Sequence, residues 1–154
     1  MKYSKYYVYG TFFLIVLLFC YFRLTIINSG NVAYTYDQGR DFLAGARIIV
    51  DKNPVFIGPT TGIGGLFHGA WWYYFTALSY LILGANPISY YHFLFALHLA
   101  VFIVWIYITK KYFGSPASIL SSLIIASAPY YVSSQTFAGN NILTIPSFTL
   151  FLIS

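Results

Sequence analysis

Long apolar runs, separated by short polar segments, dominate the pattern along the chain. Three of these runs cover residues 6–27, 88–109 and 117–132, and they approach or reach the ~20 residues with which an α-helix crosses a bilayer. A fourth run occupies 142–154 and meets no polar flank before the sequence ends. The pattern predicts an all-α fold, a polytopic bundle of transmembrane helices whose fourth span is cut short. We therefore expect residues 1–154 to form the N-terminal part of one membrane domain.

The first run predicts an uncleaved membrane anchor. A cleaved signal peptide has a shorter apolar core and a cleavage site of small residues, and residues 28–31 offer no such site. Lys2 and Lys5 precede the run, and positive charge beside a span favours the cytoplasmic side. We expect a multi-pass protein of the cell membrane with a cytoplasmic N-terminus.

The segment 69–83 decides the topology, because it either spans the membrane or lies at its surface. It is apolar but short, and its first half is aromatic; runs of ~10 to 14 residues are more often interfacial than spanning. If it does not span, Lys110 and Lys111 fall on the same cytoplasmic side as the N-terminus, and if it spans, that pair lies outside. The lysines favour an interfacial helix over residues 69–84, within an external loop of residues 28–87.

The composition excludes a water-soluble domain. Hydrophobic residues make up 59% of the chain, charged residues make up 7%, and the mean hydropathy is +0.72, whereas soluble domains carry about 25% charged residues. The net charge of +5 does not indicate a nucleic-acid partner, because the basic residues form no stripe or face. Cys20, the single cysteine, rules out a disulfide framework and a cysteine metal site. The expected partner of this surface is the lipid bilayer.

All acidic residues of the chain lie in the external loop, and carboxylates gather in the longest loop simply because they avoid hydrocarbon. They are Asp37, Asp41 and Asp51. The pattern around them adds a second feature, because the spacing of apolar residues over 37–52 predicts a helix that lies in the interface. Its apolar face is expected to hold Phe42, Leu43, Ala46, Ile49 and Val50.

Two explanations of the polar residues on this helix stay open. In the first, Asp37 is the N-cap or a first-turn residue, and the other charges form surface ion pairs such as Arg47 with Asp51. In the second, Asp37, Arg40 and Asp41 point toward one region and form a site, because residues one turn apart share a helix face.

The residues after this helix supply further candidates. Residues 58–65 are rich in Gly, Pro and Thr, which predicts turns, and they lack the Gly-Lys-Ser or Gly-Lys-Thr of a phosphate loop. His68 follows, either as a proton-transfer or phosphate-contacting group or as a plain hydrogen-bonding residue. Trp71, Trp72 and Tyr73 come next, and such rings commonly anchor a helix at the membrane surface.

These features follow one another in a characteristic order: an anchor, an acidic motif at the head of a juxtamembrane helix, a Gly-Pro stretch, a short aromatic helix, a span ending in basic residues, and a small-residue span ending in Ala-Pro. Here the motifs after the anchor are the sequence YDQGRD over 36–41, Gly58-Pro59, residues 71–84, residues 110–114 and Ala128-Pro129. This layout resembles the N-terminal part of the GT-C integral-membrane glycosyltransferases, which include the protein O-mannosyltransferases of glycosyltransferase family 39, the lipid A aminoarabinose transferases and the Rgt-type enzymes.

The resemblance implies an inverting transfer of a sugar from a polyprenyl-phosphate carrier to a hydroxyl of a lipid or glycan acceptor at the outer face of the membrane. Asp37 would be the catalytic base. Arg40 and His68 would offset charge on the leaving phosphate, and the aromatic residues would hold the sugar or the prenyl chain. The substrate-binding set implied by the resemblance is Arg40, Asp41, His68, Trp71 and Trp72.

Two departures from the family pattern bear on cofactors. Gln38 stands where many members have Glu, and Asn140 and Asn141 stand where some members carry an acid. A divalent metal is compatible with the family but is not supported by these residues, so we expect neither a metal nor another cofactor.

The competing class is a non-enzymatic multi-pass membrane protein, either a transporter or an assembly subunit. A transporter should carry ionisable and helix-breaking residues inside its spans, and the predicted spans hold almost none. Because the chain covers only the first part of the family layout, we expect this portion alone to insert into a membrane without catalysing transfer.

Overall fold

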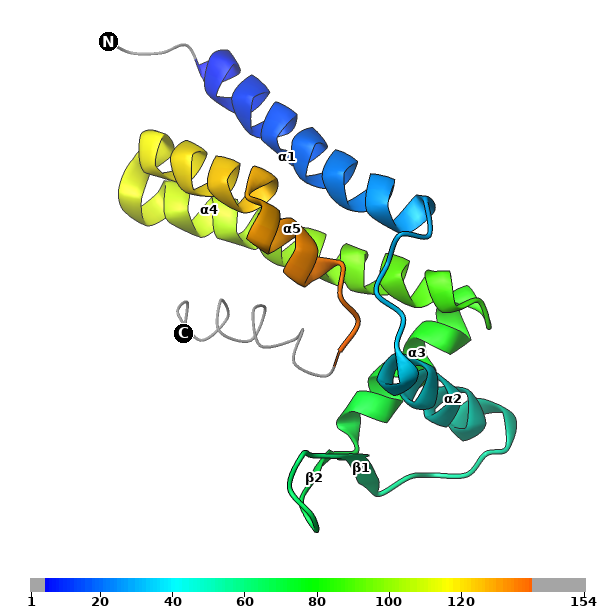
Figure 1. The fold of residues 1–154 in the computed structure, drawn as a ribbon. Helices are drawn as coiled ribbons and strands as arrows, with labels where there is room; N and C mark the ends of the chain where they lie inside the picture. The colour runs from blue at the N-terminus through cyan, green and yellow to red at the C-terminus, as the bar shows by residue number, and fades with distance from the viewer. Residues whose placement is uncertain (1–4, 140–154) are drawn as a thin grey trace.

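The computed structural model describes residues 5–139 as a set of helices with one small β-hairpin (Figure 1). Helices account for 74% of it, in agreement with the predicted all-α class. The elements are α1 (Lys5–Asn28), α2 (Tyr36–Val50), β1 (Ile57–Thr60), β2 (Phe67–Gly69), α3 (Trp71–Leu83), α4 (Pro87–Ser127) and α5 (Pro129–Gln135). The predicted fourth span, 142–154, lies outside the described residues.

Two helices of the described part, α1 and α4, are long and apolar enough to cross a membrane. Helix α4 is bent at Gly114, whose φ of 82° lies in the left-handed region that favours glycine. The chain doubles back at this point, so α4 consists of two arms (Figure 1). Pro116 is tolerated just after the bend, because a proline in the first turn of a helical arm removes no hydrogen bond that the arm needs. The first arm contains the apolar run 88–109, and the second arm contains the first part of the run 117–132.

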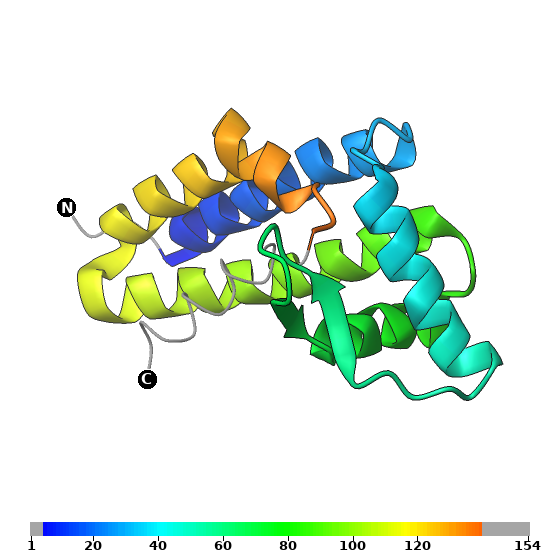
Figure 2. The same cartoon turned by 60° about the horizontal axis from the view of Figure 1, so that its bottom comes forward.

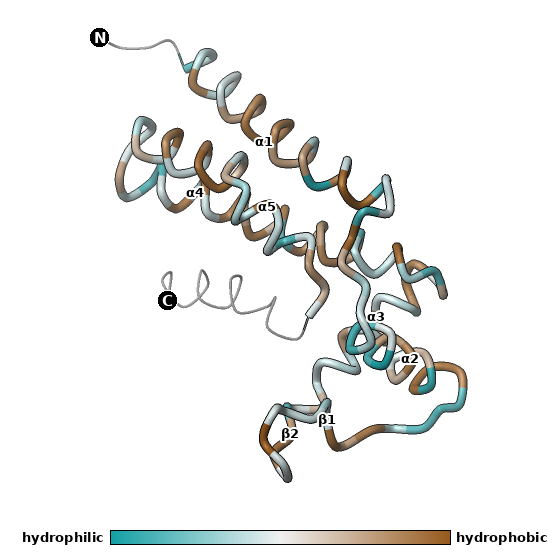
Figure 3. Tube along the Cα trace, viewed as in Figure 1, coloured by the Kyte–Doolittle hydropathy of each residue, from teal (hydrophilic) through white to brown (hydrophobic). Residues whose placement is uncertain are grey.

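A single seam of α1 faces α4. The buried residues of α1 recur every three or four positions, which is the spacing of one helix face. They are Phe12, Ile15, Phe19, Arg23 and Ile27. Phe19 stacks on Phe102 of the first arm of α4, with ring centroids 4.3 Å apart. Many of the exposed residues of α1 and α4 are also large and apolar, and brown stretches recur along both helices in Figure 3, as expected for contact with lipid.

The second arm of α4 packs closely because it presents small side chains. Ser118, Ser122 and Ala126 recur every four residues and are fully buried. Near the bend, the hydroxyl of Thr109 donates to the hydroxyl of Ser118 over 2.8 Å. Small residues and hydroxyl bonds between helices are typical of helix packing in membranes.

The apolar run 117–132 is not one helix, contrary to the prediction. The second arm ends at Ser127, and Ala128 has an extended backbone with φ −65° and ψ 127°. The reason is Pro129, because the ring of a proline disfavours helical backbone in the residue before it. The remainder of the run forms the separate short helix α5.

Helices α2 and α3 pack against each other at the end of the molecule where α1 ends and α4 begins (Figures 1 and 2). Their closest point is Gly45, where an added Cβ would lie 2.2 Å from Thr76 Oγ1 and 2.8 Å from the backbone nitrogen of Ala77. The two backbones therefore meet directly, which only glycine permits at this position.

This close approach changes the buried face of α2 from the one that the sequence predicts. The buried residues of α2 are Gln38, Asp41 and Gly45. Leu43 and Val50, two members of the predicted apolar face, are 51% and 63% exposed. The prediction gave weight to large apolar side chains, whereas the packing centres on the residue with no side chain at all. Phe42 keeps its expected place and packs at the edge of the core.

A short antiparallel hairpin, which was not predicted from the sequence, follows α2. Strands β1 and β2 pair with Ile57 opposite Gly69 and Thr60 opposite Phe67. Gly58 allows this pairing, because a Cβ there would lie 2.4 Å from the carbonyl oxygen of His68. The predicted turns are present between the strands, over residues 61–66.

Candidate functional site

A polar hollow of about 270 Å³ lies beside the N-terminal end of α2. Its walls come from three parts of the chain: the first turns of α2, the β-hairpin, and the segment after α5. The lining residues are Asp37, Gln38, Arg40, Asp41, Thr60, Thr61, Gly62, His68, Phe137 and Gly139. Four of the predicted site residues thus share one hollow, although the hairpin carrying His68 is separated from α2 in the sequence.

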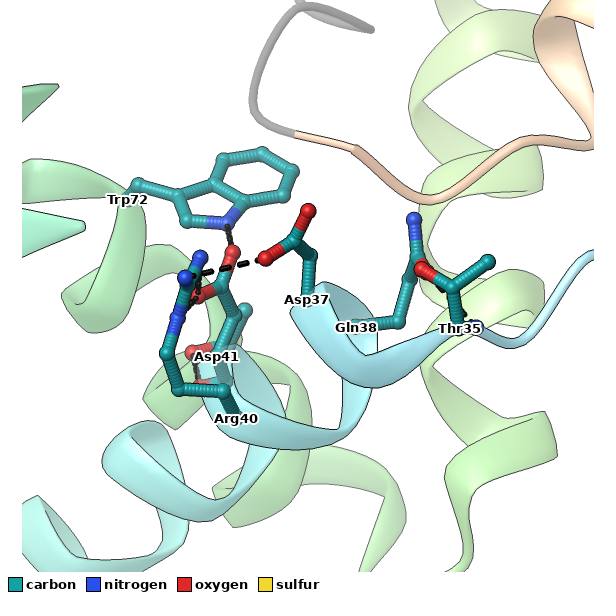
Figure 4. Close-up of polar contacts among 7 residues, drawn as sticks. Thr35, Asp37, Gln38, Arg40, Asp41 and Trp72 are labelled. Carbon is teal, nitrogen blue, oxygen red and sulfur yellow. Dashed lines mark hydrogen bonds and ion pairs between the residues drawn. The ribbon is translucent and has the colours of Figure 1, made fainter. Parts of the chain in front are cut away.

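The N-terminus of α2 is built by Thr35, not by Asp37. Thr35 is the N-cap: its side-chain oxygen accepts from the backbone N–H of Gln38, and the side-chain oxygen of Gln38 accepts from the backbone N–H of Thr35 over 2.8 Å. This is the reciprocal arrangement of a capping box. The Thr35 hydroxyl also donates to the Gln38 side-chain oxygen (Figure 4). Asp37 is therefore the first-turn residue of the two positions predicted for it, where the positive end of the helix dipole favours its charge.

One guanidinium joins the two carboxylates of the hollow (Figure 4). Arg40 Nη1 lies 2.9 Å from Asp37 Oδ1. Arg40 Nε donates to Asp41 Oδ1 over 2.9 Å, and Nη2 lies 2.8 Å from the same oxygen. The predicted ion pair of Arg47 with Asp51 is absent, and in the described part of the chain both ion pairs belong to Arg40.

The two carboxylates differ in their surroundings. Asp41 is 5% exposed, and its second oxygen, Oδ2, accepts a hydrogen bond from the indole N–H of Trp72 over 2.7 Å. The Thr76 hydroxyl donates to the backbone carbonyl of Asp41. The side chain of Asp37 is 67% exposed and has Arg40 as its ion-pair partner. Asp41 is thus held in place by Trp72 and Arg40, while the side chain of Asp37 is exposed to the hollow.

The pKa shifts around this cluster follow from the same geometry. Partial burial works against the charged form of Arg40, but the hydrogen bond and charge of Asp41 and the charge of Asp37 raise the pKa of the guanidinium. Burial also raises the pKa of the Tyr73 phenol, and the charge of Asp41 adds to that effect while Arg40 opposes it. Both groups therefore stay protonated at neutral pH.

The aromatic candidates do not line the hollow. Trp72 is 1% exposed and lies in the core, where its ring stacks on Phe75 with centroids 5.9 Å apart. Trp71 is 53% exposed and Tyr73 is buried. In this structure Trp72 contributes by holding Asp41, and Trp71 faces outward beside it. Any direct contact of the two tryptophans with a substrate remains a prediction.

Several lining residues were missed from the sequence. Thr60 and Thr61 add hydroxyls, and Phe137 and Gly139 close one side of the hollow. The sequence around Phe137 and Gly139 gives no sign of this role, because these residues come close to α2 only through the way α4 and α5 fold back toward it. Within residues 5–139, no group of three or more His, Cys, Asp or Glu is placed to hold a metal ion.

Comparison of the chain with protein-family models, with curated proteins and with solved structures gives no match. Any assignment of this chain to a class of proteins therefore depends on two features of its own structure: the two long apolar helices and the polar hollow at one end of them.

Proposed function

We propose that the chain is the membrane-embedded portion of a glycosyltransferase that moves a sugar from a polyprenyl-phosphate carrier to a hydroxyl of a lipid or glycan acceptor at the outer face of the cell membrane. The observation that carries this proposal is the hollow in which Asp37, Arg40, Asp41 and His68 meet, at one end of two helices of bilayer length. A donor carried on a lipid reaches the surface of the membrane, so a site for it belongs at such an end.

In the proposed reaction, Asp37 takes the proton of the acceptor hydroxyl, whose oxygen forms a new bond to the anomeric carbon. The bond from that carbon to the phosphate oxygen breaks, and its electron pair stays on the phosphate. At rest Asp37 balances part of the charge of Arg40. Protonation of Asp37 removes that balance, so the positive charge of Arg40 becomes available when negative charge develops on the leaving phosphate. Asp41 and Trp72 hold Arg40 in place meanwhile.

The proposed topology has a cytoplasmic N-terminus, with α1, the first arm of α4, and the second arm of α4 together with α5 crossing the membrane. Lys110 supports it, because its Nζ lies 4.1 Å from the ring centroid of Tyr9 and 5.5 Å from that of Phe12. The bend of α4 therefore lies beside the N-terminal half of α1, and Lys5, Lys110 and Lys111 gather at one end of the bundle, as positive charges on the cytoplasmic side do. Asp37 and Asp41 of α2, and Asp51 directly after it, lie at the opposite end.

Cysteine labelling tests this topology. In a Cys20→Ser background, Tyr112→Cys near the bend and Asp51→Cys after α2 are both exposed positions. An impermeant maleimide added to intact cells should label Asp51→Cys and leave Tyr112→Cys unlabelled until the membrane is opened. Labelling of both positions from outside would contradict the proposed number of crossings.

The catalytic proposal is tested by Asp37→Asn in membranes that contain the whole gene product. Asparagine keeps the shape but cannot accept the proton, so the rate of sugar transfer from a polyprenyl-phosphate sugar should fall by on the order of 10² to 10⁴. Asp51→Asn is the matched control, because Asp51 is exposed and lies at the other end of the same helix. It should transfer at the wild-type rate. Near-wild-type transfer by the Asp37→Asn protein at equal expression would overturn the proposal.

A further inference from the structure

The β-hairpin carries two chemically different sets of side chains. Its polar residues Thr60, Thr61 and His68 line the hollow together with Gly62. Its large apolar side chains are instead half exposed or more. Ile57 is 60% exposed, Ile63 64%, Leu66 54% and Phe67 51%, and Phe56 just before β1 is 85% exposed. Exposed large apolar residues gathered on one short element mark an interaction surface.

Helix α3 also carries exposed apolar side chains. The hairpin lies next to the N-terminal end of α3 (Figures 1 and 2), since β2 ends two residues before Trp71. On α3, exposed apolar residues recur at the spacing of one helix face, opposite the face that packs on α2. They are Trp71, Tyr74, Leu78, Leu81 and Ile82. The hairpin and α3 are therefore neighbouring elements that both carry exposed apolar side chains outside the α1–α4 seam.

The charge pattern indicates what covers this surface. No Asp, Glu, Lys or Arg occurs between Lys52 and Lys110, so the hairpin, α3 and the first arm of α4 as far as Thr109 form one charge-free stretch of sequence. Protein-binding surfaces are normally ringed by polar and charged residues that exclude wrong partners. A charge-free surface joined to a helix of bilayer length, with Trp and Tyr at its margin, has the chemistry of the membrane interface.

We propose that the exposed apolar side chains of residues 56–67, in and just before the β-hairpin, insert into the interfacial layer of the same bilayer that surrounds α1 and α4. The hairpin then lies between lipid and the polar hollow: Thr60, Thr61 and His68 line the hollow, and Ile63, Leu66 and Phe67 reach into lipid. This inference concerns the position of the hairpin and holds whether or not the hollow carries out sugar transfer.

Spin-label accessibility tests the proposal on the full chain, reconstituted in phosphatidylcholine vesicles. Nitroxide labels are placed on Ile63→Cys and Phe67→Cys in a Cys20→Ser background, and on Asp51→Cys as the water-exposed control. The labels at Ile63 and Phe67 should collide several-fold more with oxygen, which concentrates in lipid, than with a water-soluble nickel chelate. The label at Asp51 should show the opposite preference. Replacing part of the phosphatidylcholine with phosphatidylglycerol should leave the values unchanged, because the hairpin carries no formal charge.

Two results would overturn this inference. A preference for the nickel chelate at Ile63 and Phe67 would place the hairpin in water. Immobilised labels that neither reagent reaches would show a protein contact, including contact with a second copy of the chain. If either variant fails to fold, as judged by its helical circular dichroism, Phe56→Cys gives the same measurement from a position that packs against little of the protein.

Discussion

Within residues 5–139, two charged side chains are buried, Arg23 and Asp41, and their polar groups find partners in different ways. In the α1–α4 bundle, Arg23 is 1% exposed, and each of its N–H donors meets a neutral oxygen. These oxygens are the side-chain amide of Gln135 and the backbone carbonyls of Phe19, Ile125 and Ala126. At the α2–α3 end, Asp41 is bound by the charged Arg40 and by Trp72, and the same Arg40 reaches the open Asp37.

The difference separates a charge whose donors are all used within the protein from a cluster that keeps an exposed carboxylate. Ile125 and Ala126 lie in the last turn of α4, where carbonyls lack partners within the helix and the helix dipole is negative. Arg23 therefore fastens α1 to the end of α4 and to α5, with no donor left for a ligand. A transporter would need an ionisable group at membrane depth that can change partners, and Arg23 is saturated. The charges around the hollow keep one exposed carboxylate.

The strongest test of this contrast is Arg23→Met, which keeps an unbranched side chain of similar length but removes every donor. The Gln135 amide and the two carbonyls at the end of α4 would lose their partner, which should lower the free energy of unfolding by on the order of 3 kcal/mol. Arg47→Met is the control, because Arg47 is exposed on α2, and it should change stability by about 0.5 kcal/mol or less. Equilibrium unfolding in mixed micelles, followed by circular dichroism, measures both. Equal stability of the two variants would refute the structural role of Arg23.

A smaller effect is expected where α2 meets α3. Gly45→Ala introduces a Cβ that would lie 2.2 Å from Thr76 Oγ1 and 2.8 Å from the backbone of Ala77, so the helices must separate at a cost of about 2 kcal/mol. Gly39→Ala, in the same helix, meets nothing closer than 3.6 Å. It should stabilise the protein by about 0.5–1 kcal/mol, because alanine favours the helix more than glycine does. The sign of the change, read from the same unfolding curves, therefore distinguishes a packed α2 from a lone surface helix, in which both variants would stabilise.

The existence and order of α1, α2, α3 and the two arms of α4 could be predicted from the sequence, because apolar runs and a capped amphipathic pattern are local signals, whereas the separate helix α5 was not predicted. Asp37, Arg40 and Asp41 could be grouped for the same reason, since they lie within one turn of a helix. The buried face of α2 could not be predicted from the sequence, because it depends on contact between Gly45 and α3, a helix about thirty residues later in the chain. Pairwise packing of this kind leaves no periodic mark.

The partner of Arg23 was hidden for a similar reason. A single arginine near the end of an apolar run commonly reaches the membrane surface. Nothing in the sequence of residues 129–135 indicates that the side chain of Gln135 contacts Arg23. Likewise, the turn-rich residues 58–65 carried no alternation long enough to predict strands, so the wall of the hollow that bears His68 emerged only from the three-dimensional arrangement.

The smallest expected change in stability concerns the start of α2. It distinguishes the role of Thr35 in capping the helix from the proposed role of Asp37 in sugar transfer. Thr35→Ala removes the N-cap that Gln38 completes, which should cost about 1 kcal/mol of stability. Thr35→Ser keeps the hydroxyl and should remain near the wild-type value. Arg40 and Asp41 are fastened to Trp72 and to the α3 contact, so loss of the cap should fray the helix before Asp37 without moving the ion cluster. Transfer by the Thr35→Ala protein should therefore stay within a few-fold of wild type, in contrast to Asp37→Asn. A loss as large as that of Asp37→Asn would mean that the cap, and not the packing on α3, holds the cluster in place.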